Sequence, residues 1–289
     1  MRPFVVVCRP FSSRPRTRPM TAPMQAIAAF PQAAARQLKI VLTDIDDTLT
    51  DHGRLPAAAY GALERLADAG LAVVPVTGRP AGWCDMIARF WPVAAVVGEN
   101  GAFWYAYDHT ARRMERHYAL DDATRVRNRA QLDAITAAVL AAVAAARIAA
   151  DQAYREADLA IDFAEDVGPL SAAEIDRIVA AFTAAGAIAK VSSIHVNGWF
   201  GDYDKRTTTL GLLSTRFALR HDAALEACTF VGDSPNDAPM FACFPLSVGV
   251  ANVRDQIARI ATPPAFVTSA RGGAGFVEFA DRLLALRAA

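Results

Sequence analysis

The sequence predicts an α/β fold in which a parallel sheet is interrupted by a smaller inserted α+β module. Short apolar runs alternate with helical patterns before residue 103 and after residue 200, as parallel strands and their crossover helices do. Between these limits, strands neighbour one another and are followed by helices. A length of 289 residues allows about two domains. We therefore expect a core domain at 39–102 and 201–289, and an inserted domain at 103–200.

The first half of the core is expected to alternate strands and helices. The runs 39–43, 71–76 and 93–97 are almost wholly apolar, which is typical of strands buried on both faces. Helices are expected at 56–69, which ends at a glycine, and at 80–90, which opens with a proline. This order predicts a parallel sheet with helices on both faces.

The inserted module is expected to contain a small antiparallel sheet. Aromatic-rich runs at 103–107 and 112–118 flank a polar turn and predict a hairpin. The remaining elements expected there are a helix at 121–150, a strand at 159–163, a helix at 171–185 opened by a capping box, and a strand at 188–196. In the second half of the core we expect helices at 207–219, 235–242, 254–260 and 276–286, and strands at 228–231 and 246–250.

Residues 1–38 carry six arginines and several prolines but no acidic residue. An arginine-rich targeting peptide has this composition, although the prolines oppose an amphipathic helix. We expect this segment to be a disordered extension outside the fold, or the product of a start codon placed too early, with Met20 and Met24 as alternative starts.

Composition excludes several classes of protein. With 53% hydrophobic residues and no net charge, the chain is too apolar to be disordered and has no overall attraction for nucleic acid or anionic membranes. The longest small-apolar stretch, 134–146, is shorter than the roughly 20 residues that a bilayer requires. The four cysteines are scattered without metal-ligand spacing, which favours reduced thiols in the cytoplasm.

Acidic side chains follow the first predicted strand, in the segment Asp44-Ile-Asp46-Asp47-Thr-Leu. Residues two apart at the end of a strand project to the same side, so Asp44 and Asp46 share a face. Two carboxylates this close repel each other unless a cation or a shared proton relieves them. A solvated acidic turn is the structural alternative.

A second segment, Thr77-Gly78-Arg79-Pro80, follows the next strand. The hydroxyl, the glycine amide and the start of a helix together suit a phosphate oxygen, although a plain strand-to-helix turn explains the segment equally. Only three of the 30 basic residues are lysines, and one of them, Lys205, lies near a helix N-terminus, where a cation is unfavourable without an anionic ligand. A solvated lysine is the alternative.

The fourth segment follows a strand of the second half: Gly232-Asp233-Ser-Pro-Asn236-Asp237. Asp237 is placed to cap the next helix, but no capping role explains Asp233. Together the segments would bring up to five carboxylates to one sheet edge, facing Lys205 and Arg79. A hard dication relieves such a cluster, and Mg²⁺ is the common choice beside phosphate. The site then suits in-line attack by Asp44 on a phosphoryl group, with Asp46 as acid and base.

The ordered set of segments, spanning residues 38–289, resembles the haloacid dehalogenase superfamily of phosphatases. The module inserted after Gly98-Glu-Asn-Gly-Ala resembles the cap of the branch that includes Cof-type, sucrose-phosphate and mannosylglycerate-phosphate phosphatases. The resemblance implies a Rossmann-like core with a specificity-setting cap. It also implies these roles: Asp44 as nucleophile and metal ligand, Asp46 as acid/base and metal ligand through its carbonyl, Thr77, Gly78, Lys205 and Asn236 in phosphate binding, Asp233 as metal ligand, and Asp47 and Asp237 as supporting residues. Asp47 departs from the glycine of most relatives.

The cap and its junction offer candidates for substrate contact. These are Glu99, Asn100, His195, Asn197 and Trp199, with Arg79 from the core. Each has a structural alternative: a turn for Asn100, a strand for His195, cap packing for Trp199. We expect a Mg²⁺-dependent phosphatase acting on a small phosphorylated metabolite, a sugar or sugar-acid phosphate, with neither nucleic acid nor membrane as partner. The alternatives are a phosphomutase of the same fold and a phosphoaccepting signalling module.

Overall fold

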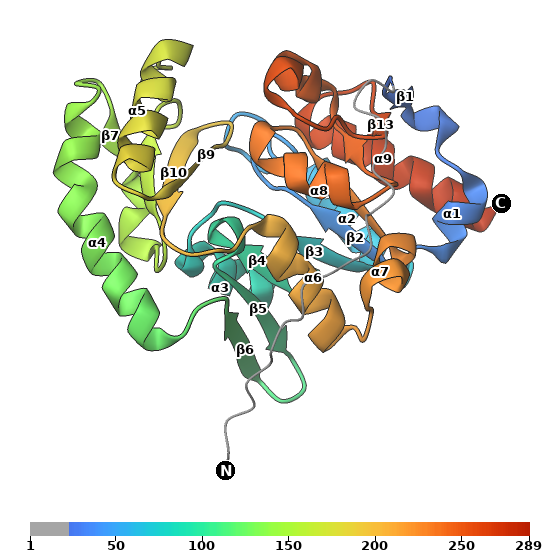
Figure 1. Ribbon diagram of the computed structural model, residues 1–289. Helices are drawn as coiled ribbons and strands as arrows, with labels where there is room; N and C mark the ends of the chain where they lie inside the picture. Colours follow the sequence, from blue (N-terminus) through green and yellow to red (C-terminus); the bar gives the residue numbers. More distant parts are fainter. Residues whose placement is uncertain (1–22) are drawn as a thin grey trace.

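The computed structural model describes residues 23–289. Its main sheet has six strands, all parallel, in the order β1-β13-β12-β11-β2-β3. The strands are β1 (Gln25–Ala26), β2 (Ile40–Thr43), β3 (Ala72–Pro75), β11 (Cys228–Gly232), β12 (Val248–Gly249) and β13 (Phe266–Val267). The sheet and its helices form the larger body in Figure 1, and a second body lies beside it. The predicted α/β class is confirmed.

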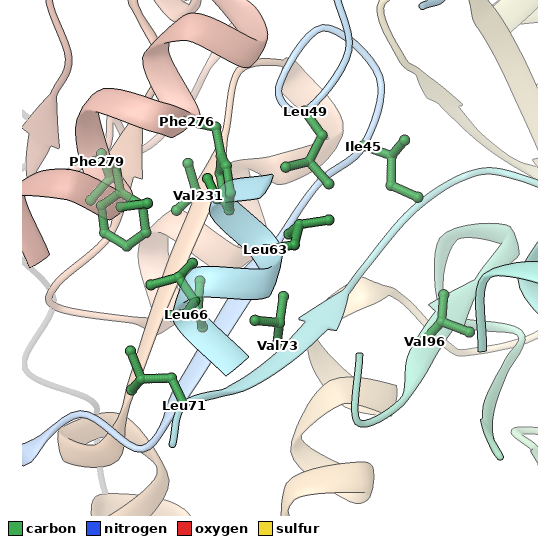
Figure 2. Packing of buried hydrophobic residues seen from close by; sticks show 14 of the residues in the cluster. Ile45, Leu49, Leu63, Leu66, Leu71, Val73, Val96, Val231, Phe276 and Phe279 are labelled. Atoms are coloured by element: carbon green, nitrogen blue, oxygen red, sulfur yellow. The ribbon is translucent and has the colours of Figure 1, made fainter. Parts of the chain in front are cut away.

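Helices cover both faces of this sheet. They are α1 (Gln32–Gln37), α2 (Ala57–Asp68), α3 (Ala81–Phe90), α6 (Lys205–Arg216), α7 (His221–Ala227), α8 (Ala238–Cys243) and α9 (Gly272–Ala288). Residues alternate between the faces, so Val41 of β2 joins one apolar cluster while Leu42 joins the other. The first cluster packs α2 against α9, and Figure 2 shows Leu66 of α2 with Phe279 of α9 in this layer. The second cluster is covered by α6, α7 and α8.

Short 3-10 turns connect these elements at the points where the chain changes direction. They are η1 (Ile27–Ala29), η2 (Glu99–Gly101), η3 (Ala150–Tyr154), η4 (Pro235–Asp237) and η5 (Ala251–Arg259).

The inserted module has its own sheet and its own apolar cluster. The sheet order is β7-β8-β10-β9, all antiparallel. Its elements are α4 (Asp122–Ala141), β7 (Arg147–Ile148), β8 (Leu159–Asp162), α5 (Ala172–Ala184), β9 (Ile188–Val191) and β10 (His195–Trp199). The side chains between the two helices and the sheet, such as Leu132, Ile178 and Val196, form a cluster separate from the two core clusters. We call this module the cap.

The hairpin that we expected in the inserted module packs on the core instead. β4 (Val96–Gly98), β5 (Phe103–Asp108) and β6 (Arg113–Tyr118) form a three-stranded antiparallel sheet. Phe103 and Tyr105 belong to one core cluster and Trp104 to the other. β4 is linked to the main sheet by a parallel bridge between Val76 and Val97. We therefore assign the hairpin to the core and begin the cap after it.

Three further expectations differ from the structure. The fold does not begin at residue 39, because β1 pairs with the edge strand β13 and Phe30 packs against Phe266 with ring centroids 5.0 Å apart. The part of the expected extension before residue 23 lies outside the described residues. The predicted helix at 121–150 ends at Ala141, and the predicted strand at 188–196 is two paired strands, β9 and β10. In residues 23–289, no helix combines the length and apolarity that crossing a bilayer requires.

Candidate active site

Two of the predicted acidic segments meet at the carboxyl edge of the main sheet. β2 and β11 are parallel neighbours, and the backbone N–H of Asp44 continues the ladder by donating to Val231 O at 2.8 Å. The loops that follow these strands therefore lie side by side. Asp44 and Asp233 are each only 4% exposed. A solvated acidic turn is excluded for both residues.

Lys205 lies between the two loops. Its Nζ donates to Asp44 Oδ1 at 2.8 Å and to Asp237 Oδ1 at 2.7 Å, and the residue is 2% exposed. The side chain is delivered by the first turn of α6, which Asp204 caps by accepting from Thr207 N. Burial opposes the charge of Lys205, but the two carboxylates outweigh it and raise its pKa. The alternative of a solvated lysine is wrong.

Asp237 both caps its own helix, as predicted, and orients Lys205. Its Oδ2 accepts from the backbone N–H groups of Asp233 (3.0 Å) and Ser234 (3.2 Å), while Oδ1 faces Lys205. Gly232 precedes this turn, and a Cβ there would collide with the Asp237 carboxylate. The glycine is required because the carboxylate folds back over the backbone.

The cluster has more negative than positive charge. Oxygen atoms of Asp44, Asp233 and Asp237 lie within 4.8 Å of one another, with Lys205 as the cation in direct contact. Burial raises the pKa of Asp44 to about 8, with Lys205 opposing the rise and Asp237 and Asp46 adding to it. Burial and the neighbouring carboxylates likewise raise the pKa of Asp233 well above its usual range. A hard cation with oxygen ligands would relieve both shifts, so the donor set fits Mg²⁺.

Two residues that the sequence analysis did not single out hold Asp233 in place. Thr48 Oγ1 donates to Asp233 Oδ1 at 3.2 Å, and Asn252 Nδ2 donates to Oδ2 at 2.8 Å. Asn252 also donates to the backbone carbonyl of Asp47 at 2.9 Å, and so ties the two loops together. Asp47 itself adopts a left-handed φ of 53°. This backbone favours glycine, and aspartate is among the residues that tolerate it, which accounts for the departure at this position.

The predicted phosphate-binding residues lie next to Asp44. Thr77 follows β3, the strand beside β2, and is fully buried. Asn236 Nδ2 donates to Asn100 Oδ1 at 3.3 Å, and a Cβ on Gly78 would lie 3.1 Å from Asn100 Nδ2. Asn100 Nδ2 is a buried donor with no hydrogen-bond partner among the described residues. A buried donor at this position suits an anionic oxygen.

Arg79 is directed at Asp46 and at the cap. Its Nε and Nη2 donate to Asp46 Oδ1 at 3.0 and 2.8 Å, and Nη2 also donates to Glu165 Oε1 at 2.7 Å. Nη1 lies 3.5 Å from Asp151 Oδ2. Burial opposes the charge, but Asp46 and Glu165 raise the pKa of Arg79 above its ordinary value. The guanidinium thus joins the predicted acid/base to two cap carboxylates.

The cap is closed over Asp44. The cap loop 192–195 reaches the edge of the sheet, and with Asn197 it lines one cavity together with Asp44, Asp46 and Asn236. This cavity has a volume of only about 10 Å³, roughly the space of one water molecule. His195 lies in it with Nε2 2.9 Å from Glu165 Oε2. His195 therefore lines the same cavity as Asp44, and its contact with a substrate stays a prediction.

Other cap candidates have structural roles. Glu99 is fully buried and accepts from the backbone N–H groups of Ala81 (2.9 Å) and Ala157 (2.6 Å), so it links the core to the cap. Trp199 stacks on Tyr203 with ring centroids 5.7 Å apart. Asn197 lines the cavity with its amide turned to the buried Asp158, 2.8 Å away.

Comparison with known proteins finds a family model that matches part of the chain. Residues 41–131 match the model of the haloacid dehalogenase-like hydrolases. No curated protein matches the sequence significantly.

Solved structures match most of the chain at low sequence identity. A protein of Thermoplasma acidophilum is 18% identical over 86% of this chain and 98% of its own, with a TM-score of 0.64. A putative HAD/COF-like hydrolase from Plasmodium vivax is 18% identical over 89% and 100%, with a TM-score of 0.62. The sucrose-phosphatase of Synechocystis, solved with sucrose and phosphate, is 16% identical over 86% and 98%, with a TM-score of 0.57. The likeness concerns the fold, including the cap.

Proposed function

We propose that the chain is a haloacid dehalogenase-like hydrolase with an inserted cap, and that it acts as a Mg²⁺-dependent phosphatase of small phosphorylated metabolites, a sugar or sugar-acid phosphate. The observation that carries the proposal is the buried ion bridge in which Lys205 joins Asp44 to Asp237 beside Asp233. Buried charges of this kind are costly unless they are paired, and three carboxylates around one ammonium still lack positive charge. A phosphoryl group with its metal ion supplies a matching ligand.

Each residue then has a chemical task. Asp44 attacks the phosphorus in line with the leaving oxygen and becomes an aspartyl-phosphate. Asp46 protonates the leaving oxygen and later takes a proton from the water that hydrolyses the intermediate. Lys205 compensates the charge of the phosphoryl oxygens, and Thr77, Gly78 and Asn236 offer donors to them. Mg²⁺, held by Asp44, Asp233 and the carbonyl of Asp46, would neutralise charge on the phosphoryl group.

The fork of Arg79 on Asp46 has a mechanistic consequence. In the closed form both Asp46 oxygens lie within 3.1 Å of Arg79 nitrogen atoms. Arg79 therefore occupies both carboxylate oxygens of Asp46, and the entering substrate must loosen this pair before Asp46 can reach the leaving oxygen.

The test is hydrolysis of p-nitrophenyl phosphate with Mg²⁺ and with EDTA. We expect phosphate release in Mg²⁺, loss of release in EDTA, and at least a ~10³-fold loss in Asp44→Asn, because the amide is not a nucleophile. Asp68→Asn, an exposed aspartate at the end of α2, is the matched control and should keep full activity. Undiminished turnover in Asp44→Asn would exclude the proposal.

Two further aspects belong to this proposal. A phosphomutase of the same fold would isomerise a hexose phosphate faster than it hydrolyses it, so the same assays separate the two activities. We also propose a cytoplasmic location, which the free thiols of Cys84, Cys228 and Cys243 support.

A further inference from the structure

A second cavity opens beside Asp46, and Asp44 is not among its lining residues. It has a volume of about 360 Å³, within the range of small-molecule sites. The core contributes the loop 50–53 with Asp46, Asp47 and Arg79, and the cap contributes Ala164, Glu165, Ser193 and Ile194. Because Asp46 is the group that would protonate the leaving oxygen, this cavity is where the leaving group must lie. We call it the leaving-group cavity.

The charges that line the leaving-group cavity are mainly negative. Asp46, Asp47 and Glu165 line it, and Arg79 is the only arginine or lysine among its lining residues. Asp46 and Glu165 occupy Nε and Nη2 of Arg79, and Nη1, which makes no hydrogen bond among the described residues, is buried 3.5 Å from Asp151 Oδ2, so no nitrogen of the guanidinium is exposed to an incoming anion. The guanidinium is thus already neutralised by the protein.

Glu165 is the cap group best placed to contact the leaving group. One of its oxygens is 2.7 Å from Arg79 Nη2 and the other is 2.9 Å from His195 Nε2. Burial opposes ionisation, but His195 and Arg79 outweigh it and lower the pKa of Glu165 to about 2. Each carboxylate oxygen keeps a free lone pair, which can accept a hydroxyl group.

We propose that the leaving-group cavity selects phosphate esters whose leaving group is an uncharged polyol, and that Glu165 sets this preference by repelling carboxylated leaving groups. The inference rests on the proposed function and narrows its substrate class to neutral sugars or sugar alcohols. A carboxylate in this cavity lies near Glu165 in a partly desolvated space, where like charges interact more strongly than in water. A hydroxyl group at the same position donates to Glu165 instead.

The test compares esters that differ in one carboxylate. Glycerol 3-phosphate is paired with 3-phosphoglycerate, and glucose 6-phosphate with 6-phosphogluconate, at one ionic strength. We expect kcat/KM to be about tenfold or more higher for the neutral member of each pair, with the difference mainly in KM. Equal or better hydrolysis of the acids would overturn the inference, since it would mean that an anionic substrate replaces Glu165 on Arg79.

The variant Glu165→Gln tests whether Glu165 causes the preference for uncharged leaving groups. Glu165→Gln should reduce the ratio of kcat/KM between the members of a pair to about threefold or less, or invert it, because Arg79 then loses one of its carboxylates. Glu64→Gln makes the same chemical change on the exposed face of α2 and should leave the ratio unchanged. An unchanged ratio in Glu165→Gln would show that Glu165 does not set the preference for uncharged leaving groups. If no ester, including p-nitrophenyl phosphate, is hydrolysed, the proposed function itself fails.

Discussion

Two clusters of charged side chains lie close together in the structure. They differ in how their negative charges are balanced by cations. The nucleophile cluster consists of Asp44, Asp233, Asp237 and Lys205, and all four residues are buried. The cap cluster joins the core to the cap through Arg79 and Arg155 and the carboxylates of Asp46, Asp151, Asp158 and Glu165. In the first, three carboxylates share one ammonium. In the second, two planar guanidinium groups each contact two or more carboxylates.

The difference appears in the acidity of the two clusters. The pKa of Asp44 rises to about 8 because burial is not offset by Lys205 alone. The pKa of Glu165 falls to about 2, because His195 and Arg79 outweigh the effect of burial. A carboxylate cluster that is short of cations is suited to receive one, whereas a compensated cluster is suited to hold two bodies together. The first cluster is therefore the expected site of chemistry, and the second holds the cap closed.

The largest expected effect is on the cap cluster. Arg155→Met leaves the buried Asp158, which contacts the guanidinium at 3.1 Å, without its cation, and leaves Asp151, which contacts it at 2.9 Å, with only Arg79 at 3.5 Å. It also removes the hydrogen bond to Gly78 O across the core–cap boundary. We expect a loss of about 3–5 kcal/mol in the free energy of unfolding, measured with urea. A loss below about 1 kcal/mol would mean that the buried carboxylates of the cap cluster do not depend on Arg155 for their stability.

Metal addition tests the nucleophile cluster. Mg²⁺ at about a hundred times its dissociation constant should stabilise the protein by about 2.7 kcal/mol, because it binds only the folded site. The rise in Tm should be largely absent in Asp233→Asn, which removes one carboxylate ligand. NaCl at equal ionic strength is the control, and an equal rise in NaCl would show that the effect is not metal binding.

The pH dependence of stability should have opposite signs for the two clusters. Without metal, the folded state keeps a proton on Asp44 up to pH about 8, so stability should fall as pH rises from about 4 toward 8. Glu165 contributes stability above its unfolded pKa of 4.5, which is lost as pH falls toward about 2. Solvent reaches Glu165, so we expect this acid-side loss to stay below about 1 kcal/mol.

Variants separate these two limbs of the pH profile. Asp44→Asn should reduce the fall at higher pH and leave the acid-side loss unchanged, whereas Glu165→Gln should remove the acid-side loss and leave the fall at higher pH unchanged. Thermal unfolding in EDTA across the pH range measures both. If Asp44→Asn leaves the high-pH fall unchanged, the fall does not come from Asp44.

The smallest effect should come from a surface ion pair. Arg65 on α2 contacts Asp281 on α9 at 2.7 Å, with side chains 45% and 60% exposed. Arg65→Met should cost less than about 1 kcal/mol, because water already solvates both groups. Comparison of the stability losses of Arg65→Met and Arg155→Met shows whether burial of the ion pair determines the size of the loss. Equal costs would mean that it does not.

Asp44, Thr77 and Asp233 could be located from the sequence because each follows an apolar strand, whereas Lys205 stood out as a rare lysine at the start of a helix. Parallel strands end at one edge of a sheet, so the loops after β2, β3 and β11 had to converge there. Asn252 follows β12 at the same edge and could have been found by extending this argument to the next strand. The weak edge strand β1 has two residues, which is too few for a recognisable pattern.

The cap contacts could not be predicted in the same way. Glu165 lies in the loop after β8, and its proximity to Arg79 depends on how the cap sits on the core. Nothing in the local sequence distinguishes it from an exposed turn residue. The end of α4 was missed for a different reason, since alanines continue past Ala141 and favour helix until packing directs the chain into β7.

The small volume around Asp44 bears on how a ligand complex can be obtained. A space sufficient for one water cannot accept a tetrahedral anion such as vanadate or phosphate while the loop 192–195 stays in place. Crystals of this closed form would therefore not bind such anions on soaking. The anion would have to be mixed with the protein before crystallisation. The same closure would make inorganic phosphate slow to leave, so product release is a natural candidate for the slowest step of turnover.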